Sequence, residues 1–260
     1  MLRSTIQTEL AVRLSSSGFV AAYEEAEELL AKADGDPDLL EALVVRRLSG
    51  EPLSWITGSL TFLGLRVQMQ SGVYEPRWQS HALAERAIAR LPDDGVAVDL
   101  CTGSGAIAMA LRAAKPRARV IATELEGRAV ACARSNGVDV YQGDLFAPVP
   151  DELAGRVDVV VGVVPYVPTP ALDVLPHDTF RFESTLAYDG GLRGIDLLSR
   201  VLVDGLHFLK PGGALLVELG GGQDADLKND LYRLGYADFN ILHDEEGDVR
   251  GIEATSRPDR

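Results

Sequence analysis

Residues 96–105 read Val-Ala-Val-Asp-Leu-Cys-Thr-Gly-Ser-Gly, and the rest of the chain can be placed relative to this stretch. Its first five residues have the near-continuous apolar character of a parallel strand buried on both faces. Residues 106–111, Ala-Ile-Ala-Met-Ala-Leu, favour a helix directly after the glycines. A strand, a glycine turn and a helix N-terminus form a cradle for an anionic group, because glycine admits a ligand to the backbone and the free N–H groups of the first helical turn point at it. The stretch therefore predicts a cofactor site in an α/β fold.

Two classes of cofactor use this architecture. The pattern Gly-x-Gly-x-x-Ala at 103–108, with Glu124 about twenty residues later, matches a dinucleotide fingerprint. Asp99 favours the second class, because a carboxylate at the end of the strand repels a pyrophosphate but attracts the ammonium and sulfonium groups of S-adenosylmethionine. We therefore predict S-adenosylmethionine as the cofactor. The simpler alternative is an ordinary tight turn in which Asp99 caps the helix.

The composition is that of an ordinary globular protein. The 260 residues, of which 46% are hydrophobic and 25% charged, suffice for one large α/β domain and a small appendage. No run approaches the roughly 18 apolar residues that span a bilayer, and the N-terminus lacks an apolar signal core, so we expect a cytoplasmic protein without a membrane partner. Cys101 and Cys132 are too few for a disulfide framework and lack zinc-ligand spacing, so no metal is predicted. The net charge of −14 argues against nucleic acid as a partner.

Hydrophobic periodicity divides the chain into three parts. Residues 1–58 have helical spacing with breaks at 15–18 and 34–37, which predicts a small helical domain. Residues 59–75 contain an alternating pattern around a glycine and predict a β-hairpin linker. From 76 to 260, strands and helices alternate as a doubly wound sheet requires. We expect the strands at 96–100, 119–123, 138–141, 157–161, 214–219, 237–242 and 249–254.

Residues just past each strand are the candidates for cofactor binding, since ligands of parallel sheets sit at the carboxyl ends of the strands. Glu124 follows the second strand, where a carboxylate can accept hydrogen bonds from both ribose hydroxyls. Asp144 follows the third and can accept from an adenine amino group, with Leu145 and Phe146 covering the base, although a turn or N-cap role is its rival. The predicted cofactor residues are Asp99, Cys101, Thr102, Gly103, Ser104, Gly105, Glu124, Asp144, Leu145 and Val163.

A resemblance to known families covers nearly the full length. Asp-x-x-Thr-Gly-Ser-Gly at 99–105 is similar to the first motif of class I S-adenosylmethionine-dependent methyltransferases, with Cys101 where glycine is more usual. The order of elements resembles the HemK/PrmC family of protein-(glutamine-N5) methyltransferases. Its elements here are Gly-Glu-Pro-Leu at 50–53, Pro-Arg at 76–77, Pro-Tyr at 165–166, Arg-Phe-Glu at 181–183 and Leu-Lys-Pro-Gly-Gly at 209–213.

The resemblance implies a fold, a reaction and a partner. The expected fold is a Rossmann-like class I methyltransferase sheet with a small helical N-terminal domain, 1–58, that recognises the substrate and is joined by a β-hairpin. The implied reaction is methylation of the side-chain amide of a glutamine, in the Gly-Gly-Gln loop of a peptide-chain release factor.

The acceptor loop departs from the family pattern. The family has Asn-Pro-Pro-Tyr where this chain has Val163, Val164, Pro165 and Tyr166. In the family, the asparagine carbonyl and a backbone carbonyl accept hydrogen bonds from the two N–H groups of the substrate amide. Val163 has no side-chain carbonyl, and loss of a pre-oriented hydrogen bond weakens transition-state stabilisation. We still predict that these four residues form the acceptor site, in a changed or relaxed pocket that is more apolar than the family's.

Other interpretations stay open. The enzyme could methylate a different protein or a small molecule, or the chain could bind the cofactor without catalysis. Adenine methyltransferases use a similar loop, but the charge opposes a nucleic-acid substrate. A nicotinamide-dependent oxidoreductase would need a second catalytic group, and none is evident. His81 and His177 are candidates for proton transfer. The simpler explanation for His81 is a structural role in a helix, and for His177 it is an exposed position in a loop.

Overall fold

The computed structural model describes residues 2–175, 179–244 and 246–258, with the side chains of residues 2, 3 and 179 outside that description. The chain forms two compact units. The first comprises Met1–Leu60 with Met69–Ser71, and the second comprises Thr61–Gln68 with Gly72–Arg260. Within the described ranges, no helix is both long and apolar enough to cross a membrane.

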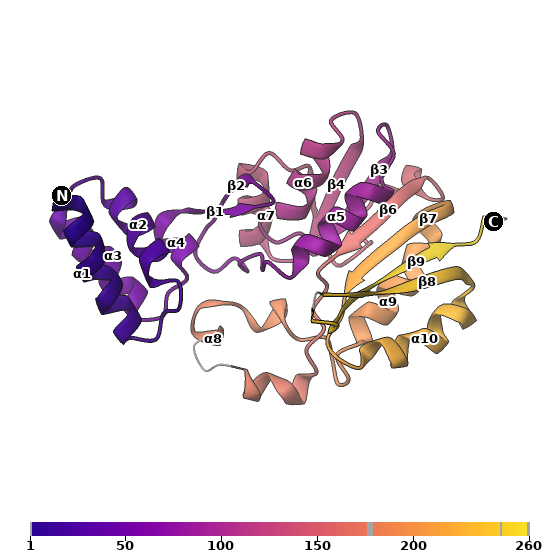
Figure 1. Ribbon diagram of the computed structural model, residues 1–260. Helices are drawn as coiled ribbons and strands as arrows, with labels where there is room; N and C mark the ends of the chain where they lie inside the picture. Colours follow the sequence, from indigo (N-terminus) through magenta and orange to yellow (C-terminus); the bar gives the residue numbers. More distant parts are fainter. Residues whose placement is uncertain (1, 176–178, 245, 259–260) are drawn as a thin grey trace. The chain divides into compact units, whose positions relative to one another are not determined.

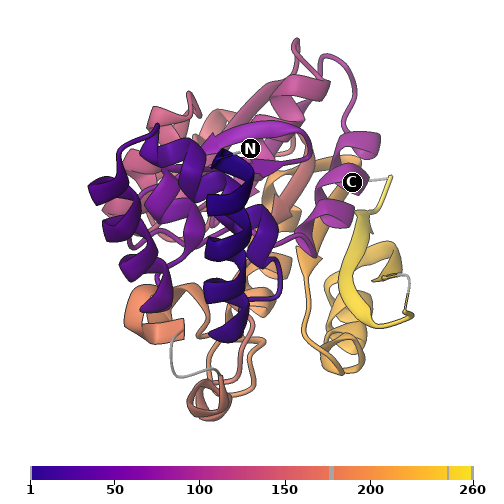
Figure 2. The same cartoon turned by 60° about the vertical axis from the view of Figure 1, so that its left-hand side comes forward.

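The first unit is a group of helices whose apolar faces meet in a core of their own (Figure 2). Its helices are α1 (Leu2–Ser16), α2 (Ala22–Ala33), α3 (Pro37–Leu48) and α4 (Leu53–Thr57). The break before α3 shows how the sequence sets a helix start. Pro37 takes the first helical position, and the Asp36 carboxylate accepts hydrogen bonds from the N–H groups of Asp38, at 2.9 Å, and Leu39, at 3.0 Å.

A β-hairpin follows α4. Its strands are β1 (Ser59–Phe62) and β2 (Leu65–Gln68). Both turn residues have positive φ, +47° at Leu63 and +76° at Gly64, which is the pattern of a type I′ turn. This turn matches the right-handed twist of the two strands.

The second unit is built on a sheet that has seven strands within the described ranges, in the order β5-β4-β3-β6-β7-β9-β8 (Figure 1). The strands are β3 (Val96–Leu100), β4 (Arg119–Glu124), β5 (Val140–Gln142), β6 (Val157–Gly162), β7 (Leu209–Glu218), β8 (Tyr236–His243) and β9 (Val249–Ser256). The strands from β5 to β7 are parallel, and β9 is antiparallel to both β7 and β8. β7 begins earlier than the periodicity predicts, because Leu209 already pairs with Val157 of β6.

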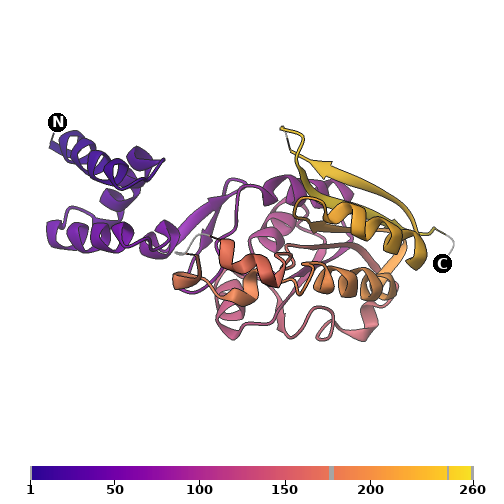
Figure 3. The ribbon, with the colours of Figure 1, turned by 90° about the horizontal axis from the view of Figure 1, so that it is seen from below.

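Helices cover both faces of the sheet. They are α5 (Ser80–Arg90), α6 (Ala106–Ala114), α7 (Gly127–Ser135), α9 (Asp196–Phe208) and α10 (Gln223–Leu234). The short helix α8 (Thr179–Phe182) lies in the segment between β6 and α9. Ile252 and Ala254 of β9 belong to the same core cluster as Leu202 of α9, whereas Glu253 between them pairs with Arg86 of α5. Because successive side chains of a strand point to opposite faces, α5 and α9 cover opposite faces of the sheet. α10 packs beside α9 (Figure 3).

The ends of the central strands meet at one edge of the sheet. Leu100, the last residue of β3, pairs with Thr123 of β4 on one side and with Gly162 of β6 on the other. A Cβ at position 162 would lie 2.8 Å from the Leu100 carbonyl oxygen, so only glycine allows this close approach. The residues that follow β3, β4 and β6 are thereby brought together.

Candidate active site

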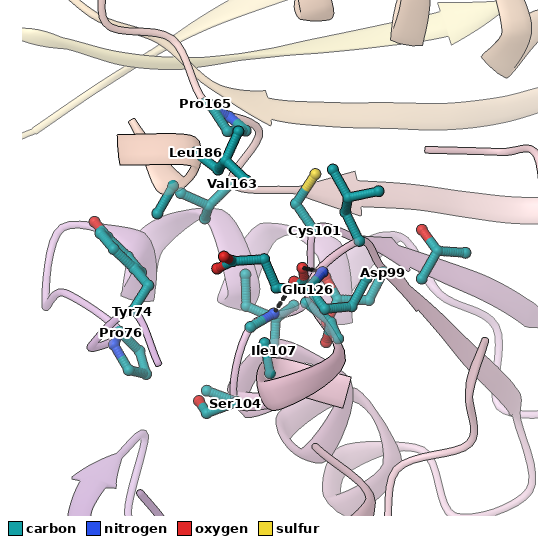
Figure 4. Close-up of a pocket in the computed structure, with 18 of the residues that line it drawn as sticks. Tyr74, Pro76, Asp99, Cys101, Ser104, Ile107, Glu126, Val163, Pro165 and Leu186 are labelled. Atoms are coloured by element: carbon teal, nitrogen blue, oxygen red, sulfur yellow. Dashed lines mark hydrogen bonds between the residues drawn. The ribbon is translucent and has the colours of Figure 1, made fainter. Parts of the chain in front are cut away.

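A pocket opens at the edge where β3, β4 and β6 end (Figure 4). The segments that follow these strands and β5 line it, together with residues from 74–76 and 186–189. Of the residues predicted from the sequence, Gly105, Val164 and Tyr166 do not line the pocket. The predicted residues that line it are Asp99, Cys101, Thr102, Gly103, Ser104, Glu124, Asp144, Leu145, Val163 and Pro165.

The turn after β3 needs an unusual backbone. φ is positive at Cys101 (+53°), Gly103 (+58°) and Gly105 (+88°). A Cβ at Gly103 would meet no atom within 4 Å, so this glycine leaves open space beside the backbone. A Cβ at Gly105 would lie 2.6 Å from Cγ2 of Val138, so Gly105 is required by packing rather than by the pocket. Cys101 adopts a left-handed conformation that glycine takes at lower cost, which fits its place in the motif.

Asp99 is buried at the start of this turn, with 1% of its surface exposed. Its Oδ2 accepts hydrogen bonds from Oγ1 of Thr102, at 2.5 Å, and from the N–H of Ala108 in α6, at 3.1 Å. Burial raises its pKa to about 7, although these two hydrogen bonds oppose the shift. Within the described part of the chain, Oδ1 has no hydrogen-bond partner. Asp99 therefore combines a bond to α6 with one oxygen available to a cationic ligand.

Glu124 ends β4 and contacts the glycine turn directly. Its Oε2 accepts a hydrogen bond from the N–H of Gly103, and its Oε1 accepts one from the N–H of Glu126, both at 2.9 Å. Burial raises the pKa of this carboxyl. Because each carboxylate oxygen has two lone pairs, both oxygens retain capacity for ligand hydroxyl groups. Glu126 also lines the pocket, which the sequence analysis did not anticipate.

The segment after β5 is arranged differently from our expectation. Asp144 is half-exposed and forms an ion pair with Arg200 of α9, at 2.7 Å between Oδ2 and a guanidinium nitrogen. Leu145 lines the pocket with a positive φ of +47°. Phe146, which we expected to cover a base, does not line the pocket but stacks on Phe208 in the core, with ring centroids 5.1 Å apart. The left-handed backbone at Leu145 turns the chain, so the two neighbouring side chains do not share the pocket.

The loop after β6 presents an apolar surface. Val163 and Pro165 line the pocket near Leu186, across from Tyr74 and Pro76 (Figure 4). Val164, which follows Val163, is fully buried in the core and can offer only its backbone to a substrate.

Tyr166 is held away from the pocket by two partners. Its hydroxyl donates to Oε1 of the buried Glu218 at 2.9 Å, and Ser80 donates to Oε2 of the same carboxylate at 2.6 Å. The Tyr166 carbonyl accepts a hydrogen bond from Nε2 of Gln223 at 2.7 Å. Tyr166 thus anchors the loop and does not line the pocket with Val163 and Pro165.

The pocket-lining residues that were not predicted from the sequence come from several parts of the chain. They are Phe62, Tyr74, Pro76, Ile107, Leu125, Glu126, Leu186, Ala187, Asp189 and Leu197, among others. Two segments lie at or close to motif elements: Tyr74 and Pro76 are at Pro-Arg, and 186–189 come just after Arg-Phe-Glu. Proximity to these elements was the available signal.

Glu183 ties these two segments together. Its carboxylate accepts from a guanidinium nitrogen of Arg77 at 2.8 Å and from the N–H of Glu75 at 3.0 Å. The Tyr188 hydroxyl donates to it as well. Glu183 is buried, so this network positions the segments on both sides of the pocket.

Only one of the two candidate histidines lies within the described residues. His81 packs edge-on against Phe62, with ring centroids 4.7 Å apart, and does not line the pocket. His177 lies outside the described residues.

Comparison with known proteins places this arrangement in context. No family model matches the chain. The chain is 35% identical over 211 residues to a release factor glutamine methyltransferase of Geobacter sulfurreducens, covering 79% of this chain and 73% of the relative. It is 34% identical to one of Mycolicibacterium smegmatis, covering 98% of this chain and 97% of the relative.

Among solved structures, a methyltransferase from Pyrococcus furiosus matches with a TM-score of 0.56 and 17% identity, covering 84% of this chain and 98% of that one. At this identity the likeness concerns the fold alone. It confirms the predicted fold class, an α/β class I methyltransferase sheet.

Proposed function

The chain belongs to the family of release factor glutamine methyltransferases, and on this premise we propose that it transfers a methyl group from S-adenosylmethionine to the side-chain amide of a glutamine in a peptide-chain release factor. The membership confirms the family relationship that the sequence motifs indicate, and with it a methyltransferase as the enzyme class. These two relatives do not favour a different acceptor or a protein that binds the cofactor without catalysis.

One observation carries the proposal. The glycine turn and Glu124, which suit the cofactor, line the same pocket as Val163 and Pro165 of the acceptor loop. A methyl transfer needs the donor and the acceptor in one water-poor cavity, with the reacting atoms in line. A single pocket that receives both segments meets this requirement.

The residues at the cofactor end have the chemistry that S-adenosylmethionine requires. When bound, the cofactor supplies an electrophilic methyl group on a sulfonium. We propose that the open space at Gly103 and the N-terminus of α6 receive its carboxylate, and that Asp99 attracts its ammonium. Glu124 would accept from the ribose hydroxyls, and Asp144 with Leu145 would contact the adenine.

The residues at the acceptor end position an amide that is a poor nucleophile. The backbone carbonyls of Val163 and Val164 are acceptors for its N–H groups, and the side chains of Val163, Leu186 and Tyr74 exclude water from the reacting nitrogen. Glu218 and Gln223 hold the loop through Tyr166, so the carbonyls keep a constant direction.

We also propose that three parts of the chain have different roles. Residues 1–58 would recognise the release factor, 59–75 would link the two parts, and 76–260 would bind the cofactor and carry out the transfer. Exposed apolar side chains in the helical part, such as Val20 and Tyr23, are suited to contact a protein.

The test is direct. The purified protein is incubated with S-adenosylmethionine and a release factor whose Gly-Gly-Gln loop is unmodified, and the glutamine is examined by mass spectrometry for one added methyl group. A release factor with alanine in place of that glutamine is the control. Absence of the modification, with cofactor binding established by calorimetry, would refute the proposed function.

A further inference from the structure

The acceptor end of the pocket lacks a side-chain hydrogen-bond acceptor at Val163, which raises the question of what replaces it. Among the described residues that line the pocket, the carboxylates are Asp99, Glu124, Glu126, Asp144 and Asp189. The first four lie at the end of β3 or β4 or shortly after β4 or β5, and they belong to the cofactor end. Asp189 alone comes from the segment that packs against the acceptor loop.

Backbone pairing holds Asp189 beside that loop. Val167 and Asp189 form a parallel bridge, in which the Val167 N–H donates to the Tyr188 carbonyl at 2.8 Å and the Gly190 N–H donates to the Val167 carbonyl at 2.9 Å. A Cβ at Gly190 would lie 2.7 Å from the Pro165 carbonyl oxygen. Glycine at 190 therefore lets the segment lie directly against Pro165, with Asp189 as its neighbour.

The two carboxylate oxygens of Asp189 have different surroundings. Oδ1 accepts hydrogen bonds from Oγ1 of Thr169 at 2.7 Å and from the N–H of Gly191 at 3.0 Å. These bonds fix the side-chain orientation. Oδ2 has no hydrogen-bond or ion-pair partner within the described part of the chain. Asp189 is thus an anchored, half-buried residue that lines the pocket, and its Oδ2 is the carboxylate oxygen left without a partner among the described residues.

We propose that Oδ2 of Asp189 accepts a hydrogen bond from the N–H group of the methyl acceptor, in the role that a side-chain carbonyl at position 163 would otherwise fill. The inference rests on the proposed function, since it concerns the acceptor of that reaction. A primary amide has two N–H groups, so Asp189 takes one and a backbone carbonyl of Val163 or Val164 takes the other. A hydrogen bond to an ionised carboxylate is stronger than one to a neutral carbonyl, so one charged acceptor offsets the loss of a neutral one.

The substitution Asp189→Asn tests the role of Oδ2 alone. Asparagine keeps a carbonyl oxygen for Thr169 and Gly191 and replaces Oδ2 by an NH₂ group, which cannot accept a hydrogen bond. We expect kcat/KM for the release factor to fall about 10- to 100-fold, the range for a lost hydrogen bond to a charged group. The midpoint of thermal unfolding and the dissociation constant for S-adenosylhomocysteine should not change.

The matched control is Asp196→Asn. Asp196 lies in the same glycine-rich segment and accepts from the Leu192 N–H at 3.0 Å, but it does not line the pocket. The kcat/KM of this variant should equal that of the unaltered protein.

A double-mutant cycle separates the proposed role from a purely structural role of Asp189, because a structural role would not change the effect of a substitution at position 163 on kcat/KM. If Asp189 fills the role of the absent carbonyl, Val163→Asn should raise kcat/KM more in the Asp189→Asn background than in the unaltered protein. Equal gains in the two backgrounds, or an Asp189→Asn variant with unaltered kcat/KM, would overturn the inference while the proposed function stands. No methylation by the unaltered protein would overturn the proposed function, and the inference with it.

Discussion

The two ends of the pocket differ in how their residues are brought together. At the cofactor end, Asp99 bonds to Thr102 and Ala108, and Glu124 bonds to the glycine turn of the neighbouring strand. At the acceptor end, the segments near residues 75, 165 and 188 are far apart in the sequence, and apart from the backbone bridge between Val167 and Asp189 they are held by side chains from distant positions. Glu183 connects the first to the third, and Glu218 and Gln223 hold the second.

Because of this difference, we expect substitutions at the two ends of the pocket to have different effects. The bonds at the cofactor end join β3, the turn that follows it, α6 and the end of β4, so we expect a change there to disturb the fold of this sheet edge itself. A substitution at the acceptor end can remove a single long-range hydrogen bond while the sheet stays folded. We therefore expect substitutions at the cofactor end to lower stability and cofactor affinity. Substitutions at the acceptor end should instead weaken recognition of the acceptor.

The largest effect should come from Gly105→Ala at the cofactor end. The new Cβ would lie 2.6 Å from Val138 and would be strained by the positive φ. We expect the free energy of unfolding to fall by about 2–4 kcal/mol, measured by chemical denaturation without cofactor. Gly103→Ala is the control, because its Cβ meets open space and costs only the backbone strain of about 1–2 kcal/mol. Equal losses for both variants would contradict the packing explanation.

The next effect should come from Glu183→Gln at the acceptor end. Loss of the charge weakens the bond to Arg77, which is partly exposed, so solvent compensates for part of the lost interaction. We expect KM for the release factor to rise about tenfold, with little change in cofactor affinity. Glu75→Gln, on the more exposed side of Arg77, should have a smaller effect. A parallel loss of cofactor affinity would show that the two ends are not independent.

A third, smaller effect is a pH dependence that belongs to the cofactor end alone. Burial raises the pKa of Asp99 to about 7, so lowering the pH through 7 protonates it and removes the charge that attracts an ammonium group. We expect the dissociation constant for S-adenosylhomocysteine to rise by up to about tenfold between pH 7 and 5.5, as the carboxylate is neutralised. Titration calorimetry would measure it, and the profile of Asp99→Asn should be flatter. A steep profile in that variant would assign the effect to another group.

The smallest effect is a gain at the acceptor end. Val163→Asn restores a side-chain carbonyl beside the acceptor nitrogen, and it should raise kcat/KM for the release factor about two- to fivefold. The gain is small because the free oxygen of Asp189 already serves that nitrogen. Steady-state kinetics on the same release factor would detect it, and an unchanged or lower kcat/KM would count against an acceptor role for position 163.

Much of the cofactor end could be predicted from the sequence. Residues 96–105 combine a buried-strand pattern with glycines that need positive φ, and parallel pairing brings Glu124 to the same edge as Asp99. Phe146 shows the limit of such reasoning. A neighbour in sequence was assumed to share the pocket, but the left-handed backbone at Leu145 sends Phe146 into the core.

The acceptor end could not be assembled in the same way. Asp189 and Leu186 follow no strand and belong to no periodic pattern, and their position after Arg-Phe-Glu does not by itself indicate that they line a pocket with Val163. Tyr166 was expected in the pocket because of its motif, yet its hydroxyl bonds to Glu218, which is 52 residues away in the sequence.

The sequence by itself determined the α/β class, the order of strands and helices, the glycine turn and the family, because each depends on short-range patterns of burial and backbone conformation. Only the tertiary structure decided which residues share the acceptor pocket, that Tyr166 is an anchor, and that Asp189 lines the pocket with Oδ1 already bonded to Thr169 and Gly191. The physical reason is that these contacts join segments far apart in the chain. Their pairing depends on packing and register across the whole sheet, which no local stretch encodes.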